Sequence, residues 1–284
     1  MPELATVAEA LAHARALGVD RLDAQLLLAH SLGCARTWLV SHDDAPICSE
    51  ALEAVAALWT RRAAGEPLAY LVGEREFRGL RLRVTRDVLV PRPDSETLVD
   101  WALELLADVQ APCIADLGTG SGAIALALKQ GCARAQVHAS DISPAALAVA
   151  RDNGQRLTLP VSWYEGDWWQ ALSASPDIRF DMIVANPPYI APGDPHLAAL
   201  QHEPLLALVP RADAGDGLTD IERIVRGAPA WLRPAGWLLL EHAFDQADAV
   251  RQRLRLAGFE CVATRTDLAG QPRVSGGRRG AAVG

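Results

Sequence analysis

The chain has 284 residues, of which 50% are hydrophobic and 22% are charged, so a disordered or fibrous protein is excluded and two unequal domains are favoured. The formal net charge of −8 argues against general binding to a phosphate backbone, and we expect no direct nucleic-acid partner. No apolar run approaches the roughly 18 residues of a membrane span, so we expect no membrane association.

Residues 7–64 form the first region, in which apolar side chains recur three and four positions apart, as in Leu22, Leu26 and Leu27. Turn signals occur near Gly33 and at residues 43–46. This pattern predicts a small bundle of about four short helices, without strands. We place an N-terminal helical domain at residues 1–76.

Residues 77–90 change to an alternation of apolar and polar side chains, interrupted at residues 85–87. Alternation with a period of two is typical of strands, and a polar interruption is typical of a turn. We therefore predict a β-hairpin linker at residues 77–92.

Strand and helix patterns alternate in the third region, residues 93–284, which predicts an α/β Rossmann-like domain with a mixed seven-stranded sheet. The last two strands leave no room for a crossover helix, so the final strand should be antiparallel. The predicted strands run from Cys113 to Leu117, Gln136 to Ser140, Val161 to Tyr164, Asp181 to Ala185, Trp237 to Glu241 and Glu260 to Thr266, with a final strand near Ala281.

A glycine-rich loop follows the first of these strands, where open α/β sheets bind ligands. Its residues are Gly118, Thr119, Gly120, Ser121 and Gly122. The loop also fits the dinucleotide fingerprint, so a nicotinamide cofactor is an alternative. Asp116, two positions before the loop, favours S-adenosylmethionine, because a carboxylate suits its ammonium group but repels a pyrophosphate. Asp116 could instead cap local backbone amides.

Two further side chains are candidates for the same cofactor. Asp141 ends the second strand, where its carboxylate could accept both ribose hydroxyls, while Ser143 could cap the next helix. After the third strand, Asp167 could accept from the adenine amine, and the indole of Trp168 could stack on the ring or belong to the core.

Asn186, Pro187, Pro188 and Tyr189 follow the fourth strand and carry the most specific signal in the chain. An amide nitrogen is a poor nucleophile, so a site that methylates it must hold its hydrogens with acceptors. The Asn186 side-chain oxygen and the Pro187 carbonyl could do so, while Tyr189 could pack on the planar group. We therefore predict that these four residues bind the substrate, with Asn186, Pro187 and Tyr189 catalytic.

Five scattered cysteines contain no CxxC pair, so no metal site is predicted, and free thiols fit a reducing, cytoplasmic location. A local excess of four positive charges lies between Arg61 and Arg92, where eight arginines stand against four acids. This stretch could be a solvated face or a docking surface for an acidic or nucleic-acid-bound partner.

Together with the glycine loop and the tetrapeptide, four further segments of the chain resemble the peptide chain release factor glutamine methyltransferase (PrmC/HemK) family. They are Glu66 to Phe77, Val90 to Glu96, Asp216 to Leu218 and Asp267 to Gly270. The likeness covers nearly the whole chain and is weakest before Gly65. It departs at Asp94 and Ser95, where family members often have Glu and Thr.

The resemblance implies an S-adenosylmethionine-dependent methyltransferase domain that releases S-adenosylhomocysteine. Its substrate would be the glutamine amide in the Gly-Gly-Gln motif of class I release factors, the partners that act in translation termination, and the helical domain would dock them. The implied cofactor-binding residues are Gly118, Thr119, Gly120, Ser121, Gly122, Asp141, Trp168 and Asn186. We expect a monomer. The alternatives are a ribosomal-protein glutamine methyltransferase and a nucleic-acid adenine-N6 methyltransferase, which would use the same tetrapeptide on a flipped base.

Overall fold

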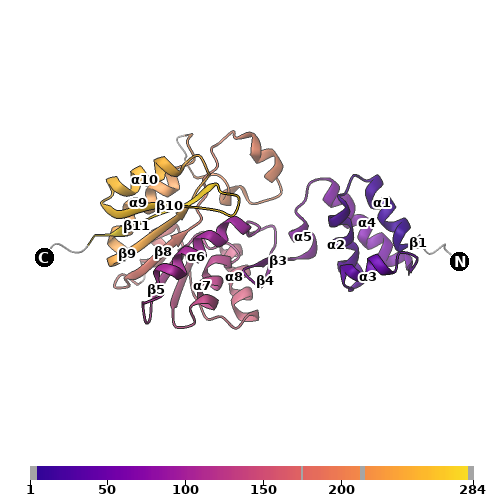
Figure 1. The fold of residues 1–284 in the computed structure, drawn as a ribbon, viewed down its shortest axis with the longest axis horizontal. Helices are drawn as coiled ribbons and strands as arrows, with labels where there is room; N and C mark the ends of the chain where they lie inside the picture. The colour runs from indigo at the N-terminus through magenta and orange to yellow at the C-terminus, as the bar shows by residue number, and fades with distance from the viewer. Residues whose placement is uncertain (1–4, 174, 212–214, 281–284) are drawn as a thin grey trace. The chain divides into compact units, whose positions relative to one another are not determined.

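The computed structural model describes residues 5–173, 175–211 and 215–280, and these fall into two compact units, one ending at Glu74 and one beginning at Arg75 (Figure 1). Each unit has a hydrophobic core of its own. No helix in the described ranges is long and apolar enough to cross a bilayer.

The first unit is the expected helical bundle, with one helix more than the pattern predicts. Its helices are α1 (Val7–Ala16), α2 (Arg21–Leu32), α3 (Arg36–Ser41), α4 (Ser49–Ala63) and α5 (Leu68–Val72). Trp59 is completely buried among them and donates from its indole N–H to the carbonyl of Ala24 at 3.2 Å. Two short strands, β1 (Ala5–Thr6) and β2 (Pro46–Ile47), also pair there. The sequence pattern predicts no strand in this unit, because two residues are too few for an alternation of apolar and polar side chains to be recognised.

The β-hairpin lies earlier in the chain than the alternation predicts. Its strands are β3 (Glu74–Phe77) and β4 (Leu80–Arg83), and the turn falls at Arg78 and Gly79, both with positive φ. A two-residue turn of this kind matches the twist of a hairpin. The expected second strand around Val90 is wrong, because Val90 donates its N–H to the carboxylate of Glu203 at 3.0 Å and not to a strand.

The second unit contains the predicted mixed seven-stranded sheet, with strand order β10-β11-β9-β8-β5-β6-β7. Strand β11 is antiparallel to both neighbours, and the strands from β9 to β7 are parallel. The strands are β5 (Cys113–Leu117), β6 (Gln136–Asp141), β7 (Ser162–Glu165), β8 (Phe180–Ala185), β9 (Leu232–Glu241), β10 (Phe259–Thr266) and β11 (Pro272–Arg279).

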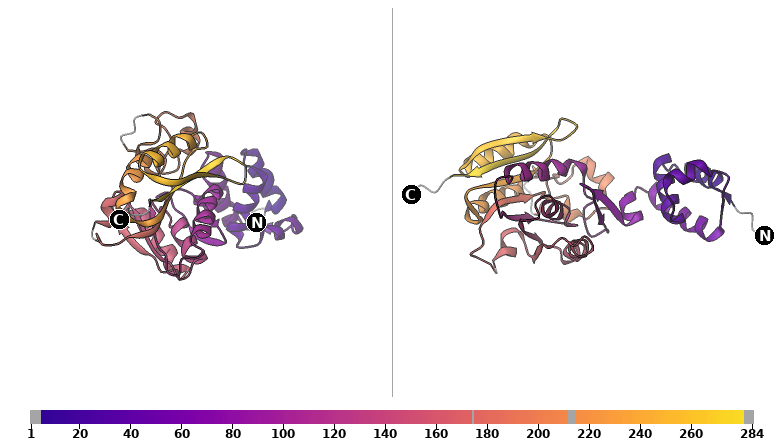
Figure 2. Two further views of the ribbon diagram at one scale, coloured as in Figure 1. Left: turned by 60° about the vertical axis from the view of Figure 1, so that its left-hand side comes forward. Right: turned by 60° about the horizontal axis from the view of Figure 1, so that its bottom comes forward.

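The last strand ends before the position that the sequence pattern indicates. The β10–β11 hairpin (yellow in Figure 2) closes within five residues, because Asp267 donates its N–H to the carbonyl of Gln271 at 2.9 Å. Strand β11 therefore begins at Pro272, and Ala281 lies outside the described residues.

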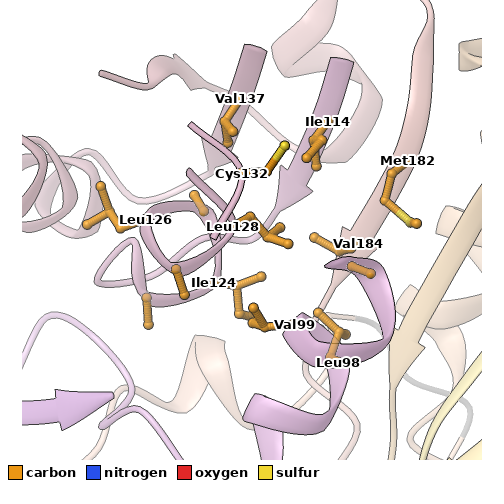
Figure 3. Packing of buried hydrophobic residues seen from close by; sticks show 14 of the residues in the cluster. Leu98, Val99, Ile114, Ile124, Leu126, Leu128, Cys132, Val137, Met182 and Val184 are labelled. Carbon is orange, nitrogen blue, oxygen red and sulfur yellow. The ribbon is translucent and has the colours of Figure 1, made fainter. Parts of the chain in front are cut away.

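Helices cover both faces of the sheet (Figure 1). One face packs against α6 (Glu96–Leu105), α7 (Ala123–Gly131) and α8 (Pro144–Arg156), and the other against α9 (Thr219–Trp231) and α10 (Ala247–Leu256). Side chains alternate between the faces: Ile114 belongs to the first core and Ala115 to the second. Figure 3 shows the first core, in which Ile114, Val137 and Met182 meet Leu98 of α6 and Leu128 of α7. Short 3-10 helices η1 (Pro93–Ser95), η2 (Trp168–Leu172), η3 (Pro195–Leu200) and η4 (Leu205–Ala207) lie in the connections.

Candidate active site

One cavity opens at the carboxyl ends of β5, β6 and β8, which is where a doubly wound sheet binds its ligand. Its walls come from the glycine loop, the ends of β6 and β7, the tetrapeptide, and the segments 87–95 and 204–211. Its lining residues include Ser95, Gly118, Thr119, Gly120, Ser121, Asp141, Asp167, Trp168, Asn186, Pro188 and Asp220.

The glycine loop owes its shape to backbone conformations that other residues rarely adopt. Gly118, Gly120 and Gly122 all have positive φ, at 72°, 55° and 83°. A Cβ on Gly118 would lie 3.1 Å from the Trp168 ring. The N–H groups of Gly118 and Thr119 both donate to the Ser140 carbonyl at 2.9 Å, which fixes the loop to β6.

Asp116 lies beneath the loop and is completely buried, so it does not line the cavity. Its Oδ2 accepts from the Thr119 hydroxyl at 2.6 Å and from the Ala125 N–H at 3.1 Å. Burial raises the pKa of Asp116 to about 7. The expectation that this acid caps local amides is therefore correct for Oδ2, whereas Oδ1 has no partner among the described residues.

Asp141 stands at the end of β6 with its carboxylate in the cavity wall. Its Oδ2 accepts from the Gly120 N–H at 2.8 Å, and its Oδ1 accepts from the Ser143 N–H at 2.9 Å. A carboxylate has about four acceptor positions, so Asp141 keeps acceptor capacity for a ligand beside its backbone donors. Burial raises the pKa of Asp141, and the backbone donors oppose that rise. Ser143 caps α8 by accepting from the Ala146 N–H at 3.2 Å, as expected.

Asp167 and Trp168 reach the cavity together, held by two residues of α9 that the sequence does not reveal. Asp167 pairs with Arg223 at 2.8 Å, and the indole N–H of Trp168 donates to Asp220 at 3.0 Å. Arg223 also pairs with Asp220 at 3.2 Å. These contacts hold the Trp168 indole against Gly118. Because the Asp167 carboxylate pairs with the Arg223 guanidinium, it is less available to accept a hydrogen bond from an adenine amine.

The tetrapeptide divides between the cavity and the protein interior. Asn186 and Pro188 line the cavity, and the Asn186 amide donates from Nδ2 to the hydroxyl of Ser95 at 3.3 Å. Pro187 is buried. Tyr189 is not among the lining residues: its hydroxyl donates to the carboxylate of Glu241 at 3.3 Å, and its ring packs against the second core.

The backbone of Tyr189 is held by Gln246, which precedes α10, and by the loop before α9. The side-chain amide of Gln246 donates to the Tyr189 carbonyl at 2.9 Å and to the Asp216 carbonyl at 3.1 Å. Gly217, with φ at 72°, lies so close that a Cβ there would stand 2.2 Å from the Tyr189 carbonyl oxygen. Only glycine fits this contact.

We expect Gly217→Ala to lower both thermal stability and turnover, because the added methyl group must push the tetrapeptide backbone aside. The unfolding free energy should fall by about 1–3 kcal/mol, typical of an overpacked site. Gly193→Ala is the matched control, since Gly193 also has positive φ but a Cβ added there would meet nothing within 4 Å. Equal losses in both variants would show that the backbone conformation, and not the contact, is responsible.

The arginine-rich stretch is largely neutralised by carboxylates. At least five of its eight arginines form ion pairs with acids, as Arg62 does with Asp23 at 2.6 Å and Arg78 with Asp100 at 2.5 Å. Arg92 pairs with the buried Glu203, which joins the two segments of the cavity wall. These contacts favour a structural role over a basic docking surface. The cysteines are free, and two of them, Cys113 and Cys132, are buried.

Comparisons with known proteins agree with this arrangement. Residues 4–73 match the PrmC N-terminal domain, and residues 95–203 match the methyltransferase small domain. A release factor glutamine methyltransferase from Bordetella pertussis is 50% identical over 92% of this chain and 95% of its own. The chain belongs to this family. A second member, from Burkholderia pseudomallei, is 49% identical over 98% of this chain and 97% of its own.

A solved structure shares the fold of the catalytic unit at low sequence identity. It is the Thermus thermophilus 16S rRNA N2 G1207 methyltransferase in complex with AdoMet and guanosine. It aligns with a TM-score of 0.53 and 21% identity, over 72% of this chain and 49% of its own. The Rossmann-like methyltransferase fold is thus confirmed.

Proposed function

We propose that this protein transfers a methyl group from S-adenosylmethionine to the side-chain amide nitrogen of the glutamine in the Gly-Gly-Gln motif of class I release factors. One observation carries the proposal: Asn186 and Pro188 open into the same cavity as the glycine loop and Asp141. A planar amide and a cofactor can therefore meet there. The membership of the family gives the substrate class.

The cofactor end of the cavity fits S-adenosylmethionine, which supplies an electrophilic methyl group when bound. The free lone pairs of Asp141 suit two ribose hydroxyls, and the close approach of Trp168 to Gly118 leaves an aromatic face in the wall. The other loop residues, Thr119 to Gly122, would border the cofactor, with Asn186 next to its methyl group.

The substrate end requires acceptors and no strong base. The Asn186 side-chain oxygen and the Pro187 carbonyl would accept the two hydrogens of the glutamine amide, which aims the nitrogen at the methyl group. A methylated amide nitrogen that carries positive charge loses its proton readily to water. Orientation of this kind is worth up to roughly 7 to 11 kcal/mol. Tyr189 would act through its backbone and its contact with Glu241, since its side chain does not line the cavity.

The helical unit would dock the release factor. Leu22, Trp38 and Val40 expose apolar side chains on this unit, at 49%, 38% and 63%. Leu22 and Val40 border the same surface hollow, and exposed apolar side chains that gather in this way are typical of a protein-binding surface. We place the reaction in the cytoplasm with a monomeric enzyme. The adenine alternative is disfavoured by the net charge of −8 and by the ion-paired arginines.

Transfer of labelled methyl groups tests the function directly. The protein is incubated with labelled S-adenosylmethionine and, separately, with a purified release factor, a ribosomal-protein extract or DNA. We expect label in the release factor alone, and none in a release factor whose Gly-Gly-Gln glutamine is changed to asparagine. Label in DNA or ribosomal protein only would refute the proposed substrate. Calorimetry is expected to detect S-adenosylhomocysteine binding and no NAD binding.

A further inference from the structure

A buried polar cluster stands behind the cavity wall at the end of β9. Its centre is Glu241, which is 1% exposed and does not line the cavity. Ser95 of η1 is 4% exposed, lines the cavity and accepts a hydrogen bond from the Asn186 amide. A buried carboxyl group with no contact to the substrate needs another reason to be there.

The hydrogen bonds of this cluster have only one consistent direction when Glu241 is ionised. A carboxylate only accepts, and Tyr189 already donates to its Oε1 at 3.3 Å. Like Tyr189, the Ser95 hydroxyl neighbours Glu241, and its hydrogen bonding lowers the pKa of that carboxyl group. Oε2 of Glu241 makes no hydrogen bond within the described structure, so it is available to accept the Ser95 proton.

The direction of the Ser95 proton decides how Asn186 is oriented. A hydroxyl has one proton, so Ser95 can only accept from Asn186 once its proton points to Glu241. The Asn186 amide must then turn Nδ2 toward Ser95, at 3.3 Å. Its Oδ1 is left for the cavity, where an acceptor is required.

We propose, building on the function proposed above, that Glu241 and Ser95 are positioning residues that fix the Asn186 side-chain amide with its oxygen toward the substrate. Both act through Asn186: Glu241 does not line the cavity, and the Ser95 hydroxyl, at the cavity wall, is engaged by Asn186. If the Asn186 amide were flipped by 180°, its Nδ2 would face the N–H groups of the substrate glutamine. Two donors would then face each other, and the glutamine could not bind.

Protonation of Glu241 should remove the constraint on the orientation of the Asn186 side-chain amide. Burial raises the pKa of Glu241 to about 7 and is the largest influence; Ser95 and Arg273 lower it, and Asp94 raises it. Burial lowers the pKa of the adjacent His242, which is therefore neutral near pH 7 and adds no charge. A protonated Glu241 can donate its own proton to Ser95. The hydroxyl proton of Ser95 is then free to turn toward Asn186. Turnover should therefore fall as the pH drops through about 7.

Glu241→Gln tests the proposal, because the side chain keeps its size but no longer titrates. At pH 8 we expect turnover to fall at least about tenfold, with S-adenosylmethionine affinity and the Michaelis constant for the release factor within about twofold of the unchanged protein. The fall in turnover between pH 8 and pH 6 should disappear. Ser95→Ala should lose turnover similarly, and Ser95→Thr, which keeps the hydroxyl, should recover most of it.

The side-chain amide of Asn186 gives a readout that does not require methylation. In ¹⁵N-labelled protein its signal, assigned by its absence from Asn186→Ala, should titrate with a midpoint near pH 7. Asp94→Asn should move the midpoint to lower pH, because removal of a negative charge favours ionised Glu241. Asp116, whose pKa is also raised to about 7, titrates in every variant. Loss of the Asn186 titration in Glu241→Gln therefore identifies Glu241.

A pH-independent Asn186 signal, a titration that persists in Glu241→Gln, or full turnover in Ser95→Ala would each overturn the positioning role. Absence of methyl transfer to release factors by the unchanged protein would overturn the proposed function instead. The amide titration would still decide the role of Glu241 in that case.

Discussion

Asn186→Ala is expected to reduce turnover at least about a hundredfold and to change S-adenosylmethionine affinity little. The side chain lines the cavity and makes one hydrogen bond within the described protein, to Ser95. Loss of one positioned polar group in a dry site costs roughly 2.7 to 4 kcal/mol of transition-state stabilisation. Single-turnover methylation of a release factor would measure the effect, and a melting curve would show whether the fold is retained.

Asn153→Ala is the matched control for Asn186. Asn153 is fully buried and donates to the carbonyls of Arg83 and Ser121, both at 2.9 Å, so its loss should lower the melting temperature. Normal turnover in Asn186→Ala with an equally lowered melting temperature would make Asn186 a structural residue and refute the mechanism.

Asn186→Asp separates the acceptor from the donor. The carboxylate still accepts from the substrate but cannot donate to Ser95. If the amide orientation matters as proposed, the aspartate variant should be nearly as impaired as the alanine variant. Retention of most activity would show that the donor to Ser95 is unnecessary.

Asp141→Ala is expected to weaken S-adenosylmethionine binding roughly 30- to 700-fold, equivalent to about 2 to 4 kcal/mol. Two charge-assisted hydrogen bonds to the ribose would be lost. The Gly120 N–H would also lose its acceptor, which loosens the loop. Calorimetry with S-adenosylhomocysteine measures the change. Asp177→Ala, which removes an exposed acid elsewhere, should bind normally. An unchanged affinity in Asp141→Ala would show that another group binds the ribose.

The sequence predicts the catalytic fold well, because the central parallel strands β5 and β8 are largely apolar runs and a loop of distinctive composition follows each at its carboxyl end. The glycine loop, Asp141 and Asn186 can all be located in this way. The hairpin is misplaced by the same pattern, since residues 84–90 alternate in polarity for a different reason: they contribute to a cavity wall, and Val90 bonds to Glu203. Alternation of apolar and polar residues shows that one side of a segment is buried. It does not show which groups the backbone of that segment hydrogen-bonds to.

The contacts behind the site could not be predicted, because they join residues far apart in the sequence. Ser95 meets Asn186 across 91 positions, and Trp168 meets Asp220 across 52. Neither pair belongs to a local motif, and only the topology of the sheet brings them together. The inward direction of Tyr189 has the same origin, since Glu241 lies on a neighbouring strand.

The place of β11 between β9 and β10 has a consequence for how the enzyme matures. Strand β10 is made before β11 but pairs only with it in the sheet, so it must wait without a partner until β11 has been synthesised. The same late strand carries Arg273, whose charge acts on Glu241. Chains fold progressively from the N-terminus during synthesis. The nascent protein can thus acquire its cofactor loop early, yet it gains the full electrostatic environment of the methyl-transfer site only after β11 has been synthesised and has paired with β9.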